Sequence, residues 1–155
     1  MVEESRIAIY DYLKPLFASV TQNVYSMRVP TENTQDDVDN GFIVIEVGSL
    51  RDDSEFDLQA SGWVRCFVTA FVPQKTRGRL DREKYKAFED SINAAIRSEI
   101  STPTSDTYAI QSDGFLSMDD DEDTNKGNQF NTFIKSFIVT IDAEEETNDN
   151  NSNND

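Results

Sequence analysis

The sequence contains no histidine and only one cysteine among its 155 residues. Without histidine the chain cannot build a Ser-His-Asp triad or a Cys-His pair, and a metal site would need oxygen ligands for a hard cation. Cys66 cannot form a disulfide within the chain, and the apolar Phe67 and Val68 beside it predict a buried, inert thiol. We therefore expect a protein that is not an enzyme and that uses no cofactor.

Positive charge and long apolar runs are also scarce. Lys and Arg number 14 against 30 Asp and Glu, which gives a formal net charge of −16. This balance argues against nonspecific nucleic-acid binding, because contacts to phosphates need clustered cations. No apolar run approaches the roughly 18 residues of a membrane span, and the start is acidic where a secretory signal is basic. We expect a chain that stays in the cytosol after synthesis and does not contact a membrane.

The strongest pattern that is present spans residues 61–100. Trp63 to Val72 is almost entirely aromatic, β-branched or small and apolar, which predicts a buried central strand. A basic turn follows, and then an amphipathic helix with Asp81 as its N-cap. Its apolar stripe has spacings of three and four and consists of Tyr85, Phe88, Ile92, Ile96 and Ile100. Such a helix needs a sheet on which to pack.

The segments before this pattern predict one helix and two strands. Residues 3–20 have helical spacing, and Pro15 is expected to kink or split that helix. Residues 23–30 alternate and end in proline, as a short edge strand does. Residues 42–47 are apolar on both faces, so we expect helices on one face and a further contact, such as a second subunit, on the other.

The segments after the helix predict a pair of strands and a tail. Residues 107–118 predict a strand that is bulged or broken at Asp113 and Gly114, and it pairs with a long strand at residues 129–142. The element order α-β-β-β-α-β-β predicts an α+β domain over residues 1–142, with a mostly antiparallel sheet of about five strands and two helices on one face. Residues 143–155 are expected to form a disordered acidic tail.

One acidic run comprises Asp119, Asp120, Asp121, Glu122 and Asp123. Its alternate acids have the spacing of an EF-hand loop, but position six would be Thr124 instead of glycine and position twelve would be Phe130 instead of glutamate. We expect a hairpin tip that faces solvent or a lumen, with calcium binding as the alternative. A two-metal carboxylate site is disfavoured, because the acid clusters lie in expected loops.

A dense basic cluster comprises Lys75, Arg77, Arg79, Arg82, Lys84 and Lys86. On a monomer it would be a solvated turn and helix start. In a head-to-tail ring it would meet an acidic patch of the next subunit and set the orientation of the contact. The candidate acidic partners are Asp36, Asp37, Asp39, Asp52, Asp53 and Asp57. A phosphate site is disfavoured, because QKTRGR lacks the glycine pattern of a P-loop.

Phenylalanine is abundant, with ten copies in the chain. A single layer of helices does not obviously bury ten phenylalanine side chains, so some of them are expected to line a subunit contact. The candidates are Phe42, Phe67, Phe71, Phe130, Phe133 and Phe137.

The order of elements resembles that of the tail terminator and related head-to-tail joining (neck) proteins of tailed bacteriophages. The matching parts are the helix RIAIYDYLKPLF, the strand NVYSMRVP, the hairpin GFIVIEVGSL and GWVRCFVTAFVP, the helix REKYKAFEDSINAAI, and a last strand pair that ends in FNTFIKSFIVTID. The likeness covers about residues 5–142 and involves no invariant motif. The long loop at residues 51–61, the acidic run and the tail depart from the compact family pattern.

The resemblance implies a structural virion protein with no enzymatic activity. It would form a homo-oligomeric ring, sixfold or twelvefold, at the head-tail junction, and would be assembled in the host cytoplasm. Its partners would be the portal-side connector and tail proteins. DNA would pass through the lumen without specific binding, since an acidic lumen repels phosphates. The alternative is a soluble cytosolic acidic binding module, such as an inhibitor or adaptor, and an enzyme ranks third.

Overall fold

The computed structural model describes residues 3–26, 29–48, 62–76, 79–118 and 129–141. A five-stranded sheet has the strand order β1-β2-β3-β5-β4. The strands are β1 (Val24–Ser26), β2 (Phe42–Val47), β3 (Trp63–Pro73), β4 (Tyr108–Met118) and β5 (Phe130–Ile141). β1 runs parallel to β2, and the other three neighbouring pairs are antiparallel. The predicted α+β fold with a mostly antiparallel sheet is confirmed.

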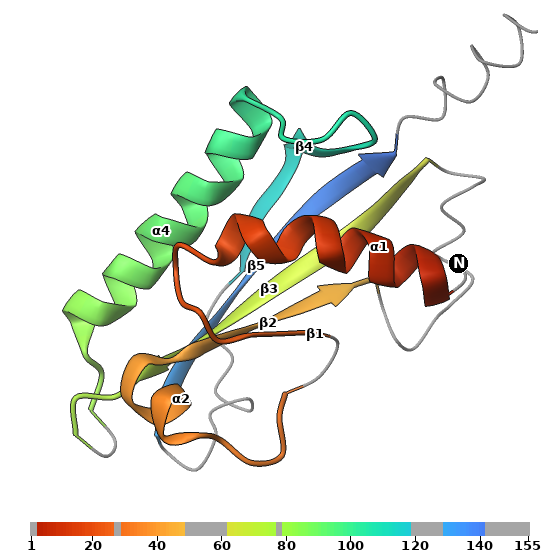
Figure 1. The fold of residues 1–155 in the computed structure, drawn as a ribbon. Helices are drawn as coiled ribbons and strands as arrows, with labels where there is room; N and C mark the ends of the chain where they lie inside the picture. Colours follow the sequence, from red (N-terminus) through yellow and green to blue (C-terminus); the bar gives the residue numbers. More distant parts are fainter. Residues whose placement is uncertain (1–2, 27–28, 49–61, 77–78, 119–128, 142–155) are drawn as a thin grey trace, which may run out of the picture.

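The longest helix of each half of the chain, at residues 3–13 and 82–101, covers the same face of this sheet (Figure 1). The helical elements are α1 (Glu3–Leu13), the 3-10 helix η1 (Lys14–Phe17), α2 (Gln35–Asn40) and α4 (Arg82–Ser101). The change from α1 to η1 occurs at Lys14, directly before Pro15, which lacks a backbone donor, so the predicted split of the first helix is confirmed. The backbone N–H of Lys84 donates to the side chain of Asp81, which confirms the predicted N-cap of α4.

The main core lies between the sheet and the helices α1, η1 and α4. Its fully buried members include Leu13, Phe17, Ile43, Val68, Ile92, Ile96 and Phe137. Each such side chain stabilises the fold by about 1.5–3 kcal/mol relative to an exposed position. Cys66 is also fully buried here, as predicted, and burial raises the pKa of its thiol. Lys135 is 3% exposed, and its ammonium lies 3.0 Å from the carboxylate of Glu89, which links β5 to α4.

The short helix α2 occurs where the sequence predicts only a polar loop. Thr34 and Asp37 form a capping box at its start, and Gly41 ends it with a φ of 82°. Val38 packs on a second, smaller cluster on the sheet face that is turned away from α1 and α4. That cluster consists of Phe42, Val44, Phe71 and Phe130. The fold therefore has a third helix, and this one packs against the opposite face of the sheet.

The register of β4 against β5 shifts between Gln111 and Leu116. This confirms the predicted bulge around Asp113 and Gly114, since an unequal number of residues on the two strands bends the sheet locally. β1 lies at one edge of the sheet, as predicted, and β4 lies at the other. The predicted acidic tail at 143–155 and the long loop at 51–61 lie outside the described residues.

Candidate interface surfaces

One surface is the sheet face opposite α1 and α4, here called the open sheet face. Strand pairing brings its residues together, and on β3 and β5 it comprises Trp63, Arg65, Phe67, Thr69, Ile134, Ser136, Ile138 and Thr140. Trp63 is 42% exposed, and Phe67, Ile134 and Ile138 are half-buried. Within the described residues, α2 is the helix that packs on this side, and it covers only the end near Phe42. Apolar groups are therefore partly exposed on this face of the sheet.

Among the six candidate phenylalanines, only Phe67 is part of this surface. The other five belong to the two buried clusters and are at most 1% exposed: Phe42, Phe71, Phe130, Phe133 and Phe137. Phe42 and Phe71 stack with ring centroids 4.4 Å apart, and Phe130 packs edge-on against both. These five are therefore core residues, and their proposed role in a subunit contact is corrected.

The open sheet face also carries two charged residues, Arg65 and Glu46. Glu46 on β2 is paired with Phe67, and burial raises the pKa of its carboxyl. The guanidinium of Arg65 donates a hydrogen bond of 3.4 Å to the hydroxyl of Ser136. Part-exposed aromatic side chains and an arginine occur together on this face, and both residue types are enriched in contacts between proteins.

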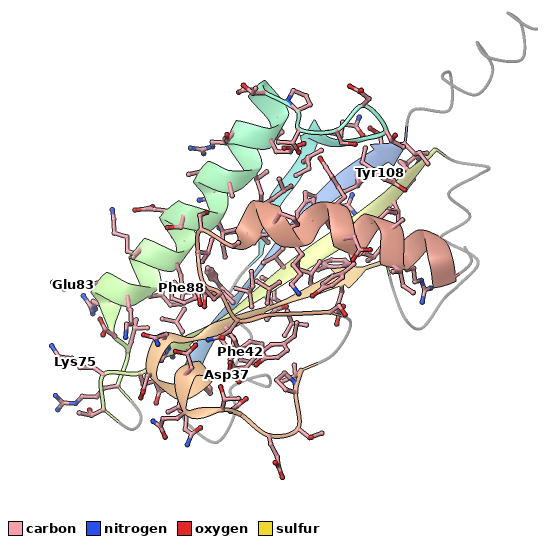
Figure 2. All side chains as sticks on the ribbon, in the orientation of Figure 1. Asp37, Phe42, Lys75, Glu83, Phe88 and Tyr108 are labelled. Carbon is pink, nitrogen blue, oxygen red and sulfur yellow. The ribbon has the colours of Figure 1, made fainter. Side chains whose placement is uncertain are left out.

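A second surface is the basic turn, defined here as Lys75, Arg79 and Arg82. All three side chains are exposed, and they lie in sequence between the end of β3 and the first residue of α4. Figure 2 shows Lys75 at this end of the molecule. Backbone hydrogen bonds fix the turn, because Lys75 N–H donates to the Arg79 carbonyl at 3.0 Å and Arg79 N–H donates to the Thr76 carbonyl at 2.8 Å. Arg77, the fourth candidate, lies outside the described residues. These backbone hydrogen bonds hold Lys75 and Arg79 close together.

The predicted acidic partners on α2 behave differently from one another. Asp36 and Asp39 are exposed, whereas Asp37 is fully buried. Asp37 accepts hydrogen bonds from the hydroxyl of Tyr25 and from the backbone of Thr34. Both oxygens of its carboxylate bond to groups of the same chain, and the side chain is buried. The prediction that Asp37 is an interface residue is therefore corrected.

The structure also places α2 and the basic cluster at the same end of one subunit (Figure 2). The ammonium of Lys84 donates to the backbone carbonyl of Asp39 at 3.1 Å. A head-to-tail contact joins two different patches on opposite sides of a subunit, so adjacent patches do not supply that geometry by themselves. The remaining predicted acids lie outside the described residues: Asp52, Asp53, Asp57, Asp119, Asp120, Asp121, Glu122 and Asp123.

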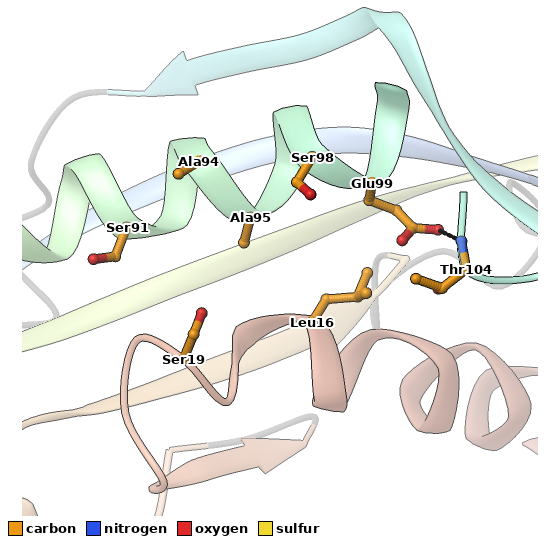
Figure 3. A pocket seen from close by; sticks show the side chains of 8 residues that line it. All are labelled: Leu16, Ser19, Ser91, Ala94, Ala95, Ser98, Glu99 and Thr104. Atoms are coloured by element: carbon orange, nitrogen blue, oxygen red, sulfur yellow. Dashed lines mark hydrogen bonds between the residues drawn. The ribbon is translucent and has the colours of Figure 1, made fainter. Parts of the chain in front are cut away.

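A third surface was not predicted from the sequence. A pocket of about 370 Å³ lies between η1 and α4, and it is lined by Leu16, Ser19, Ala94, Ala95, Ser98 and Glu99 among others (Figure 3). Glu99 is only 2% exposed. The sequence does hold one indication of this buried acid. Glu99 follows Ile92 and Ile96 at helical spacing, which places a carboxylate on the buried face of α4.

Hydrogen bonds hold one oxygen of Glu99 in place. Oε2 accepts from the hydroxyl of Tyr12 at 2.6 Å and from the backbone N–H of Thr104 at 3.0 Å. Burial, and then this bond to Glu99, raise the pKa of Tyr12, so the phenol remains a donor. The other oxygen, Oε1, is buried and has no hydrogen-bond partner among the described residues. The pocket therefore contains an acceptor oxygen to which a ligand could donate a hydrogen bond.

The described residues contain no group of three or more His, Cys, Asp or Glu side chains arranged to hold a metal ion. Within the same ranges, no helix is both long and apolar enough to cross a membrane.

Comparison with models of known protein families finds no match to this chain, and comparison with curated proteins finds none either.

Proposed function

We propose that the chain is a structural subunit of a homo-oligomeric ring at the head-tail junction of a tailed bacteriophage. The observation that carries this proposal is the open sheet face, where Trp63, Phe67 and Ile138 are partly exposed side by side. Partly exposed apolar side chains that gather on one face of a domain can mark a contact with another protein. The occupant proposed here is a second copy of the same chain.

The arrangement of layers supports a head-to-tail contact. The helices α1 and α4 cover one side of the sheet and the open sheet face lies on the other (Figure 1). Two different surfaces on opposite sides let each copy pack against the next, and such a contact closes into a ring when the rotation per subunit allows it. The order of helices and strands, which resembles that of the joining proteins, supports the same assembly.

The charge of the chain supports a conduit for DNA. With a formal net charge of −16, most of the surface repels phosphates, so DNA can pass without being held. The cations of the basic turn are confined to one end of the subunit, where they are available for contacts between proteins.

Light scattering coupled to size-exclusion chromatography tests the proposal. We expect one discrete species of about six or twelve times the 17.6 kDa subunit mass. The variant Phe67→Glu should shift it towards monomer, because it puts a charge into the apolar contact. Val29→Glu is the matched control, since Val29 is 36% exposed and outside the open sheet face. A strictly monomeric chain that binds a basic partner would instead favour the acidic binding module.

A further inference from the structure

The pocket between η1 and α4 has the features of a site for a cationic side chain. Its volume of about 370 Å³ lies within the range of ligand pockets, which is about 300–1,000 Å³. Leu16, Ala94 and Ala95 give it apolar walls, and the carboxylate of Glu99 lies at one end (Figure 3). In Figure 3 the oxygen of Glu99 that does not bond to Thr104 is turned towards Leu16, into the pocket.

Among the residues that the structure describes, this oxygen, Oε1, has no donor, although Glu99 is 98% buried. Leaving a buried carboxylate oxygen without a donor is unfavourable, and a charged donor is the strongest partner for it. The Tyr12 hydroxyl and the Thr104 N–H are already committed to Oε2. Because Oε1 is turned into the pocket, a donor from outside the described residues can approach it from that side.

We propose that the pocket of one copy receives Arg79 of the neighbouring copy, whose guanidinium donates to Oε1 of Glu99. This contact rests on the proposed ring and adds a charged contact to the interface between neighbouring copies. Arginine suits the site better than lysine, because its planar donors match a carboxylate and it is more weakly hydrated. Leu80, which follows Arg79 and is 42% exposed, supplies an apolar group for the walls of the pocket.

The geometry requires a second copy. The basic turn precedes α4 and Glu99 lies near its end, and a helix of 20 residues is about 30 Å long. The turn therefore cannot reach the pocket of its own subunit. Within the described residues, no carboxylate lies within ion-pair distance of Arg79. The two ends of α4 thus present complementary chemistry, as a head-to-tail contact needs.

Two variants each remove one half of the contact. Glu99→Gln keeps an oxygen for Tyr12 but directs an amide donor at the incoming guanidinium, and Arg79→Glu reverses the charge of an exposed turn residue. Each variant alone should weaken self-association by about tenfold or more, measured as the dissociation constant of the subunit contact. Circular dichroism should show that both variants remain folded.

Mixing the two variants is the decisive test, with native mass spectrometry as the measurement. Glu99→Gln retains Arg79, and Arg79→Glu retains Glu99, so a mixed pair has one intact contact. We expect heterodimers containing one copy of each variant and no closed rings. Arg97→Glu, the same reversal at an exposed arginine on α4, should assemble like the unmodified chain.

The outcomes separate this contact from the ring itself. If the unmodified chain forms rings and both variants do so with the same dissociation constant, the contact is refuted while the ring stands. If the variants are monomeric but do not pair when mixed, Arg79 and Glu99 are not partners. If the unmodified chain is monomeric at every concentration, the proposed ring is contradicted and the contact with it.

Discussion

The hydroxyl of Tyr25 on β1 lies 2.9 and 2.8 Å from the two carboxylate oxygens of Asp37 on α2. Asp37 is fully buried and also closes the capping box with Thr34. One carboxylate therefore caps the start of a short helix and attaches that helix to the edge strand. The acid-rich segment between β1 and β2 is ordered by this contact rather than by helix propensity, because α2 has only six residues.

Tyr25→Phe should lower the free energy of unfolding by about 1–3 kcal/mol, because the buried carboxylate of Asp37 loses a donor. Urea titration at pH 7 measures this difference. Tyr10→Phe is a suitable control, since the Tyr10 hydroxyl makes a longer bond of 3.3 Å to a backbone carbonyl. An equal loss in both variants would contradict a special role for the pair.

The stabilisation by the Tyr25–Asp37 hydrogen bonds should also be lost at alkaline pH. Burial and the hydrogen bond to Asp37 raise the pKa of Tyr25 from 10.0 to about 12. A pKa raised in the folded state means that the contribution to stability is complete below about pH 10 and is lost as the pH rises through about 12. The difference between the unmodified chain and Tyr25→Phe should therefore shrink over that interval, which thermal unfolding at a series of pH values would show.

Gly41→Ala should destabilise the fold by at least about 2 kcal/mol. A Cβ at Gly41 would lie 2.7 Å from the carbonyl oxygen of Phe71 and 2.7 Å from the ring of Phe88, and the φ of 82° disfavours any side chain. Gly62→Ala separates these two causes, because Gly62 has a φ of 74° and no atom within 4 Å of its Cβ position. Thermal unfolding should show the larger loss at Gly41, and equal losses would contradict the steric account.

Glu46→Gln should raise the free energy of unfolding at pH 7 by about 1 kcal/mol or less, since the side chain is only half-buried. Burial raises the pKa of Glu46 above its ordinary value of 4.5. The contribution of the protonated form is complete below pH 4.5 and is lost as the pH rises, so the gain from Gln should vanish in acid. Glu32→Gln, at an exposed position, should show no such gain. A gain independent of pH would contradict burial as its cause.

Regular periodicity made most of the fold predictable. The stripe from Phe88 to Ile96 predicted α4, and the β-branched and aromatic run after Trp63 predicted β3, because both patterns extend over more than two turns or pleats. The split at Pro15 followed from the missing backbone donor. The parallel pairing of β1 with β2 did not follow, since three residues of alternation do not say which way a neighbour runs.

The candidate surfaces were less predictable, because burial of single acids depends on distant partners. Asp37 stands in an acid-rich segment that resembles a solvated loop, and only Tyr25 and the helix cap explain its burial. Glu99 bonds Tyr12, which is 87 residues away in sequence, so its environment exists only in the folded chain. The exposure of Lys75 and Arg79 was predictable, since a charged turn between a strand and a helix remains in solvent.

Electron microscopy of the purified, unmodified chain tests the central claim most directly. The account predicts ring-shaped particles with a central opening and sixfold or twelvefold symmetry, in which the open sheet face of each copy is covered by the next. Particles that remain monomers at high concentration, or that close into twofold dimers, would contradict it, because neither arrangement uses two different surfaces in a head-to-tail contact.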